Sequence, residues 1–170
     1  MTGVSFVQLR QCLYYLYFGK DYPAEKAYKY IVPFQRNYES PLQAGEFDTY
    51  IQYSVDRDIR ITQDAYNYDK NEVHKVAFCH IRFVGTHAEE WAKVFHHLTK
   101  RNDTAQIWWD VCHAELLEGV GDIIAKTIDY FGTGASIAFD IHFKLHYIES
   151  IDCDWSPLKG VSLASGNVNY

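Results

Sequence analysis

Eight histidines are the residues of this sequence best suited to chemistry, either as metal ligands or as acid–base groups. His96 and His97 are adjacent on an expected helix, where neighbouring side chains point about 100° apart and do not readily share an ion. His142 and His146 share one face of an expected strand, but Lys144 lies between them and its charge disfavours a bound cation. The spacing of the histidines therefore predicts no metal site and no cofactor.

Other fragments of catalytic motifs are incomplete. Cys112 and His113 are neighbours without a third group to orient them as a nucleophile and base. The glycine pairs at 119–121 and 132–134 lack the lysine or third glycine of a phosphate-binding loop, so we interpret both as turns. We expect a protein that is not an enzyme. One alternative stays open, a ligand-binding or enzymatic α+β domain whose site includes His80, His113 and aromatic side chains.

Composition narrows the class of protein. The chain has 170 residues, of which 48% are hydrophobic and 22% charged, as expected for one folded domain. Its net charge of −6 argues against a sequence-independent nucleic-acid binder. No apolar run approaches the roughly 20 residues of a membrane span, and the first residues lack the basic start of a secretory signal. The cysteines show no paired spacing and are expected to be buried free thiols: Cys12, Cys79, Cys112 and Cys153.

The periodicity of apolar residues predicts an α+β fold. Residues 73–84 carry apolar groups on both faces, which indicates a central strand, whereas 136–150 alternate between a core face and a polar face. A capping-box pattern at 86–89 begins a central helix over about 87–100. The other expected elements are helices at 4–18 and 23–30, a strand at 47–55, an irregular segment at 56–71, an ambiguous strand or helix at 107–112, a short helix or turn at 114–121, and a strand at 122–130.

These elements assemble into a single domain, residues 1–155. Its mainly antiparallel β-sheet is packed by the N-terminal helix and the central helix, and the chain closes with a long β-hairpin. Residues 156–170 contain few apolar groups, so we expect an extended tail that docks on neighbouring subunits.

One stretch of the chain resembles a known family. The strand at 76–85 ends in Gly85 and leads through Thr86 and His87 into the helix that begins at Ala88. This pattern is similar to the strand–Gly–x–x–Ala–helix pattern of the bacteriophage neck terminator family, the tail-terminator-like proteins of the head–tail connector. The N-terminal helix, the proline-containing loop and strand at 41–55, the leucine-rich turn at 115–119 and the closing hairpin follow the order of that family.

The resemblance implies a structural virion protein without catalytic activity. Members form a hexameric ring at the neck, between head and tail, which caps the tail tube, contacts head-completion or connector proteins, and meets the sheath where the tail is contractile. The ring leaves a channel through which genomic DNA passes without specific binding. Such a protein is made in the host cytoplasm and is not a membrane protein. The alternative within the same virion is a head-completion stopper or a tube protein.

Composition is compatible with this expectation. Tyr, Phe and Trp number 14, 10 and 4, and such residues are enriched in subunit contacts. Six copies at −6 each would carry −36, and an acidic channel wall lets DNA slide. The residues that we expect at subunit interfaces are Arg36, Tyr38, Pro41, Phe47, Arg57, Arg60, Tyr66, Tyr68, Trp155, Leu158, Val161, Leu163 and Tyr170.

Overall fold

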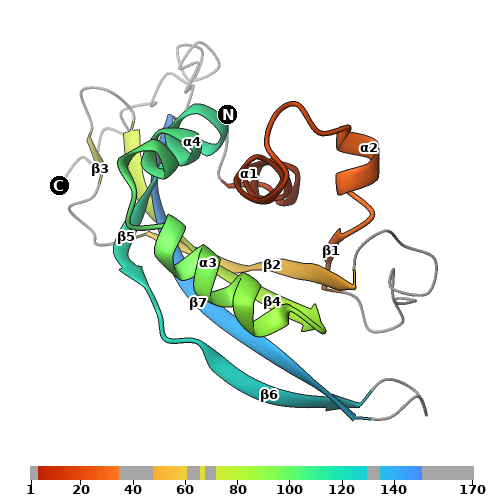
Figure 1. Cartoon of the computed structure of the whole chain (residues 1–170). Helices are drawn as coiled ribbons and strands as arrows, with labels where there is room; N and C mark the ends of the chain where they lie inside the picture. The colour runs from red at the N-terminus through yellow and green to blue at the C-terminus, as the bar shows by residue number, and fades with distance from the viewer. Residues whose placement is uncertain (1–3, 35–47, 61–65, 68–71, 130–134, 151–170) are drawn as a thin grey trace, which may run out of the picture.

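The computed structural model describes residues 4–34, 48–60, 66–67, 72–129 and 135–150 (Figure 1). The helices are α1 (Phe6–Tyr17), α2 (Ala24–Ala27), α3 (Ala88–Leu98) and α4 (Asn102–Cys112). The strands are β1 (Ile31–Pro33), β2 (Thr49–Arg60), β3 (Tyr66–Asn67), β4 (Glu72–Gly85), β5 (Ala114–Val120), β6 (Ile124–Asp129) and β7 (Ala135–Ser150).

Within these described ranges the strands form one sheet of seven, in the order β1-β2-β4-β7-β5. The short strand β3 pairs with β4, and β6 pairs with the first half of β7. Among the pairs of described strands, β1–β2 alone is parallel. The expected α+β class with a mainly antiparallel sheet is therefore confirmed, and β4 is the central strand that its apolar faces predicted.

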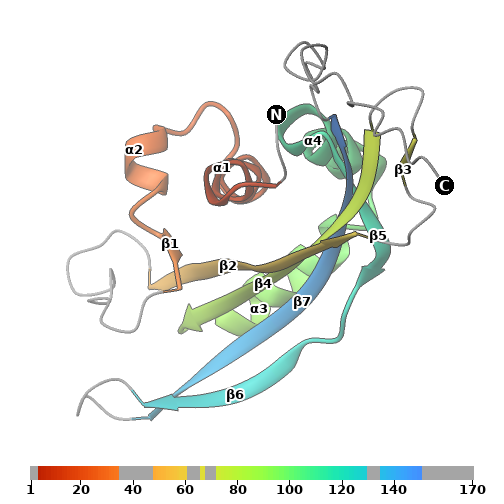
Figure 2. The same cartoon turned by 180° about the vertical axis from the view of Figure 1, so that it is seen from behind.

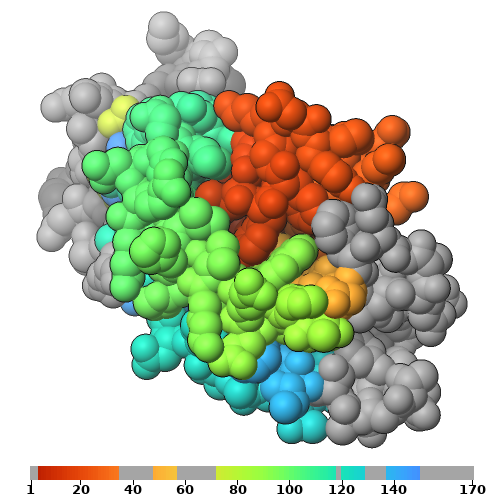
Figure 3. Space-filling view, in the orientation of Figure 1, coloured from red at the N-terminus to blue at the C-terminus, as the bar shows by residue number. Residues whose placement is uncertain are grey.

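Helices α1, α3 and α4 lie on one face of the sheet and leave the other face without a helix among the described residues (Figures 1 and 2). Figure 3 shows α1 and α2 side by side with α3 and α4 as one layer, with β6 and β7 emerging below it. Beneath this layer is the main core, which includes Leu13, Ile81, Phe83, Phe95 and Leu145, all buried. We call the opposite face the open face, because no described helix covers it.

The helix starts are fixed in different ways. Ser5 and Gln8 form a complete capping box at α1, in which the Ser5 hydroxyl accepts from the Gln8 N–H. The capping box expected at 86–89 is wrong, because α3 begins one residue later, after His87, with no side-chain cap. There the Thr49 hydroxyl accepts from the His87 N–H at 2.9 Å, so a β2 residue satisfies the N-cap N–H that the N3 side chain takes in a capping box.

Two further expectations from the sequence are wrong, because the residues concerned belong to strands. The short helix or turn expected at 114–121 is wrong, because Ala114–Val120, which include the leucine-rich turn expected at 115–119, form β5. His113 ends α4 in the left-handed conformation (φ 49°), and the following residues pair with β7. The irregular segment expected at 56–71 is wrong for its described residues. Strand β2 continues through Arg60, with a bulge that leaves Asp56 without a partner on β4, and Tyr66–Asn67 form β3.

Several expectations concern residues outside the described ranges, including the docking of the tail at 156–170.

The segment at 107–112, which the sequence left open between strand and helix, belongs to α4. Cys12, Cys79 and Cys112 are buried free thiols, as expected, whereas Cys153 is outside the described ranges. None of the described helices is both long and apolar enough to cross a bilayer.

Candidate functional site

Ionisable side chains gather on the open face of the sheet, where β2, β4 and β7 lie side by side. His80 of β4 is paired in register with His142 of β7, and Arg82 is paired with Asp140. Because directly opposed residues of an antiparallel pair share a face, these four side chains form one cluster. The bulge in β2 adds Asp56 to the edge of this cluster.

The most buried ionisable group of the cluster is the Asp140 carboxylate, which has no exposed side-chain surface. The Arg82 guanidinium donates to both of its oxygens, from Nε at 2.6 Å and from an Nη at 2.9 Å. Lys126 of β6 lies 3.0 Å from Oδ2. Two cations from neighbouring strands therefore compensate one buried anion, as a buried carboxylate requires.

Burial and pairing act in opposite directions on Asp140. Burial alone would raise the pKa of its carboxyl, but the contacts with Arg82, His80 and Lys126 outweigh burial and hold that pKa well below its usual range. Asp140 is thus ionised at neutral pH. It is a fixed negative charge under the open face of the sheet.

His80 is held tightly beside this charge. Its side chain is 12% exposed, and its Nε2 lies 3.3 Å from Oδ2 of Asp140. Among the described residues, this buried nitrogen has no hydrogen-bond partner. The ring is stacked between Phe34, at 4.7 Å between centroids, and His142, at 4.2 Å. Packing on both faces of the ring therefore limits it to small changes of tilt.

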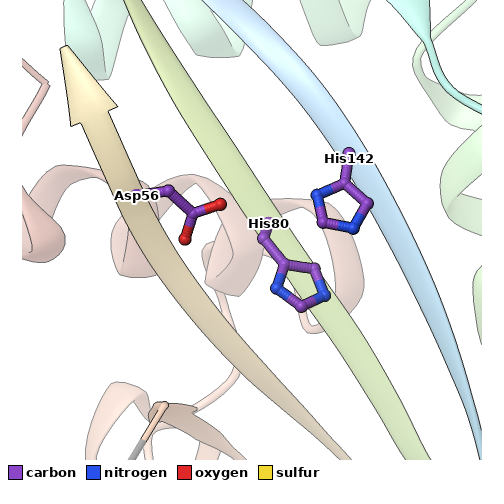
Figure 4. A group of neighbouring side chains, drawn as sticks. All are labelled: Asp56, His80 and His142. Carbon is purple, nitrogen blue, oxygen red and sulfur yellow. The ribbon is translucent and has the colours of Figure 1, made fainter.

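Asp56, His80 and His142 converge from three adjacent strands (Figure 4). One ligand atom from each lies within 4.8 Å of the others. Burial and the neighbouring His80 lower the pKa of His142, against the opposing effects of Asp140 and Asp56, so its imidazole is neutral at pH 7. Two imidazoles and one carboxylate are a donor set that divalent transition ions accept.

A cleft of about 400 Å³ opens beside this group. Its lining includes Asp56 and His142 from the group itself, together with Phe78, Lys144 and Val120. The carboxylate and one imidazole are therefore in contact with the space that a small molecule or ion would enter.

Little of this site follows from the sequence. The sequence pairs His142 with His146 on one strand face, but the ring of His146 contacts His74 instead, with His74 Nδ1 and His146 Nε2 3.0 Å apart. His80 does belong to the cluster, whereas His113 caps α4 and packs against Trp109. Asp56 is far from both histidines in sequence, and only the strand register brings the three residues together.

The structure does not test the residues that we expect at subunit interfaces. Arg57, Arg60 and Tyr66 lie in β2 and β3, with side chains that are outside the described part of the structure. The others are outside the described residues altogether: Arg36, Tyr38, Pro41, Phe47, Tyr68, Trp155, Leu158, Val161, Leu163 and Tyr170.

Comparison with known proteins adds no identification. No family model matches the chain, and no curated protein matches its sequence significantly. Within the described residues, the ionisable cluster and the edges of the sheet are the features that bear on function.

Proposed function

We propose that this chain is a structural subunit of a bacteriophage neck, which assembles into a hexameric ring between head and tail. The ring caps the tail tube, joins it to the connector and leaves a channel for DNA. Support comes first from the order of elements: an N-terminal helix, paired strands, a central helix after Gly85 and a closing hairpin, as in the terminator family that the sequence resembles.

The observation that carries the proposal is the β6–β7 hairpin, which extends beyond the helical layer (Figures 1 and 2). Among the described strands, none pairs with the outer edge of β6. Ile124 and Ile137 on this hairpin are 44% and 58% exposed. A long edge with exposed β-branched side chains is a surface for pairing with another chain, and natural monomers usually protect such an edge.

Ring closure uses this edge in a head-to-tail manner. A cyclic assembly needs two different complementary faces on each subunit, so the hairpin of one copy would contact another surface of the next. A stable contact of this kind buries about 800 Å² on each partner. The net charge of −6 on each copy is compatible with a channel that does not retain DNA.

The test is the mass and shape of the purified full chain. Light scattering coupled to size-exclusion chromatography is expected to give six copies of 19.8 kDa, about 119 kDa, alone or after addition of tail tubes. Negative-stain microscopy is expected to show a ring with a central hole. Long stacks of rings would favour a tube protein instead, and a monomer in both conditions would contradict the proposal.

A second candidate function is binding of a small ligand, which the cleft beside Asp56 and His142 favours. In this case the domain would be a monomer that binds its ligand on the open face of the sheet. The same scattering measurement separates the two candidates.

A further inference from the structure

We propose that Asp56, His80 and His142 form a binding site for a divalent transition-metal ion of the zinc class, on the open face of the sheet. This site does not depend on ring assembly. It joins three adjacent strands, β2, β4 and β7, at the point where the bulge interrupts the β2–β4 pairing.

The distances are close to those that coordination requires. The three donor atoms lie within 4.8 Å of one another, whereas ligands of a tetrahedral zinc ion, bound at 2.0–2.2 Å, lie about 3.3 Å apart. His142 and Asp56 are exposed side chains and have room to move inward by this difference. The stacked rings of His80 and His142, 14° from parallel, would tilt so that one nitrogen of each points to the ion.

The environment of His80 favours a ligand role. Metal-bound histidines usually direct their second nitrogen at a carboxylate, which fixes the ring and strengthens the ligand. His80 has this arrangement, because its Nε2 faces the buried Asp140 carboxylate at 3.3 Å. A small tilt of the ring on metal binding would give Nε2 the hydrogen bond that it lacks and leave Nδ1 for the ion.

The charges around the site decide which ions it would take. Arg82 and Lys126 are both paired with Asp140, which offsets their repulsion of a cation. Lys144 lies over the Phe78 ring, with Nζ 5.7 Å from its centroid. With cations this near, a hard ion held mainly by charge gains little, whereas a transition ion gains bonds to two imidazoles. We therefore expect zinc, cobalt and nickel to bind, and magnesium and calcium not to bind.

The adjacent cleft gives access to the fourth coordination position. Three protein ligands leave a tetrahedral ion with one open position, and the cleft of about 400 Å³ meets two of those ligands, Asp56 and His142. Water or a small anion can reach the ion from this side.

The experiment is calorimetric titration of the chelator-treated full chain with zinc chloride, with magnesium chloride as the comparison ion. We expect one zinc ion per chain with a dissociation constant in the micromolar range or tighter. His142→Gln and Asp56→Asn are each expected to weaken zinc binding at least 10-fold. Both side chains are exposed, so these variants should keep the fold, which circular dichroism checks.

His146→Gln is the matched control, because it removes a histidine from the same strand and face but outside the group. It is expected to change zinc affinity less than twofold, and the absorption of bound cobalt should persist in this variant and disappear in His142→Gln. Millimolar zinc affinity, equal affinity in wild type and His142→Gln, or loss of binding only in His146→Gln would each overturn the proposal; the last result would indicate adventitious binding at His74 and His146.

Discussion

At the scale of single residues, Asp140 shows how far one buried charge organises its surroundings. Its position in an alternating strand predicts a polar side chain on the solvent face, yet the structure buries it completely beneath Arg82 and Lys126. The cations come from strands on either side of β7, and only the folded register places them there. The sequence alone predicts that Asp140 lies on the polar face of its strand, but it does not predict the ion pairs with Arg82 and Lys126.

Asp140→Asn is expected to destabilise the protein by about 3 kcal/mol or more, because Arg82 loses its charged partner in a largely buried place. Urea unfolding followed by circular dichroism measures the change. Asp103→Asn is the matched control, since Asp103 forms an exposed pair with Arg101, and it should leave the unfolding midpoint unchanged. Equal midpoints for the two variants would show that the buried network contributes no stability.

Gly85 links β4 to α3 at a place where only glycine fits. Its φ is +122°, and a Cβ there would lie 2.0 Å from the backbone oxygen of Asp48. Gly85→Ala is therefore expected to cost at least about 3 kcal/mol, from the strained dihedral together with the clash. Gly19→Ala is the control, because φ is +75° but the space is open, and only about 1 kcal/mol is expected. Thermal unfolding of both variants compares the two, and similar losses would contradict this account.

At the scale of elements, the sequence predicts those with strong periodicity and misses those set by distant partners. The strands at 73–84 and 136–150 and the helix at 4–18 follow from their own apolar patterns. Strand β5 does not, because its pairing with β7 outweighs its weak local pattern. The start of α3 depends in the same way on Thr49, which is 38 residues before His87. The candidate metal site was missed for this reason too, since strand register alone assembles it.

The start of β2 and the start of α3 are also joined by an ion pair, which gives a pH dependence. His87 Nδ1 lies 2.8 Å from a carboxylate oxygen of Asp48. The hydrogen bond and charge of Asp48 raise the pKa of His87 above 6.5, and the bond from His87 lowers the pKa of Asp48 below 3.8. The stabilisation from His87 is present below its unfolded pKa and lost as pH rises through the folded one. The stabilisation from Asp48 is present above its unfolded pKa and lost as pH falls through the folded one.

The pair should therefore stabilise the protein most between roughly pH 4 and 6.5, where both groups are charged. NMR titration of the His87 ring is expected to give a pKa above 6.5 in wild type and a lower one in Asp48→Asn. The stability difference between the two proteins should shrink at high salt and above pH 8, because both groups are exposed. An unchanged His87 titration in the variant would rule out the pair.

At the scale of the whole molecule, the two faces of the sheet carry different groups of side chains. The helical layer buries the apolar face of the sheet and supplies the main core. The opposite face holds a small apolar cluster, with Tyr50, Val84 and Ala138, and next to it the ionisable group. None of the described strands pairs with the outer edge of β6, so the assembly that we propose would use this edge without cost to the core.

Substitutions at Ile137 test whether the β6–β7 hairpin forms the subunit contact, because this side chain is 58% exposed on the projecting hairpin. If the hairpin forms the ring contact, Ile137→Asp buries a charge at the interface and should shift the mass from six copies toward one. Its thermal stability as a monomer should stay close to that of wild type, because an exposed position contributes little to the core. Ile137→Val keeps an apolar β-branched side chain and should keep the ring. Intact rings in Ile137→Asp, by light scattering at the same concentration, would move the subunit contact away from the hairpin.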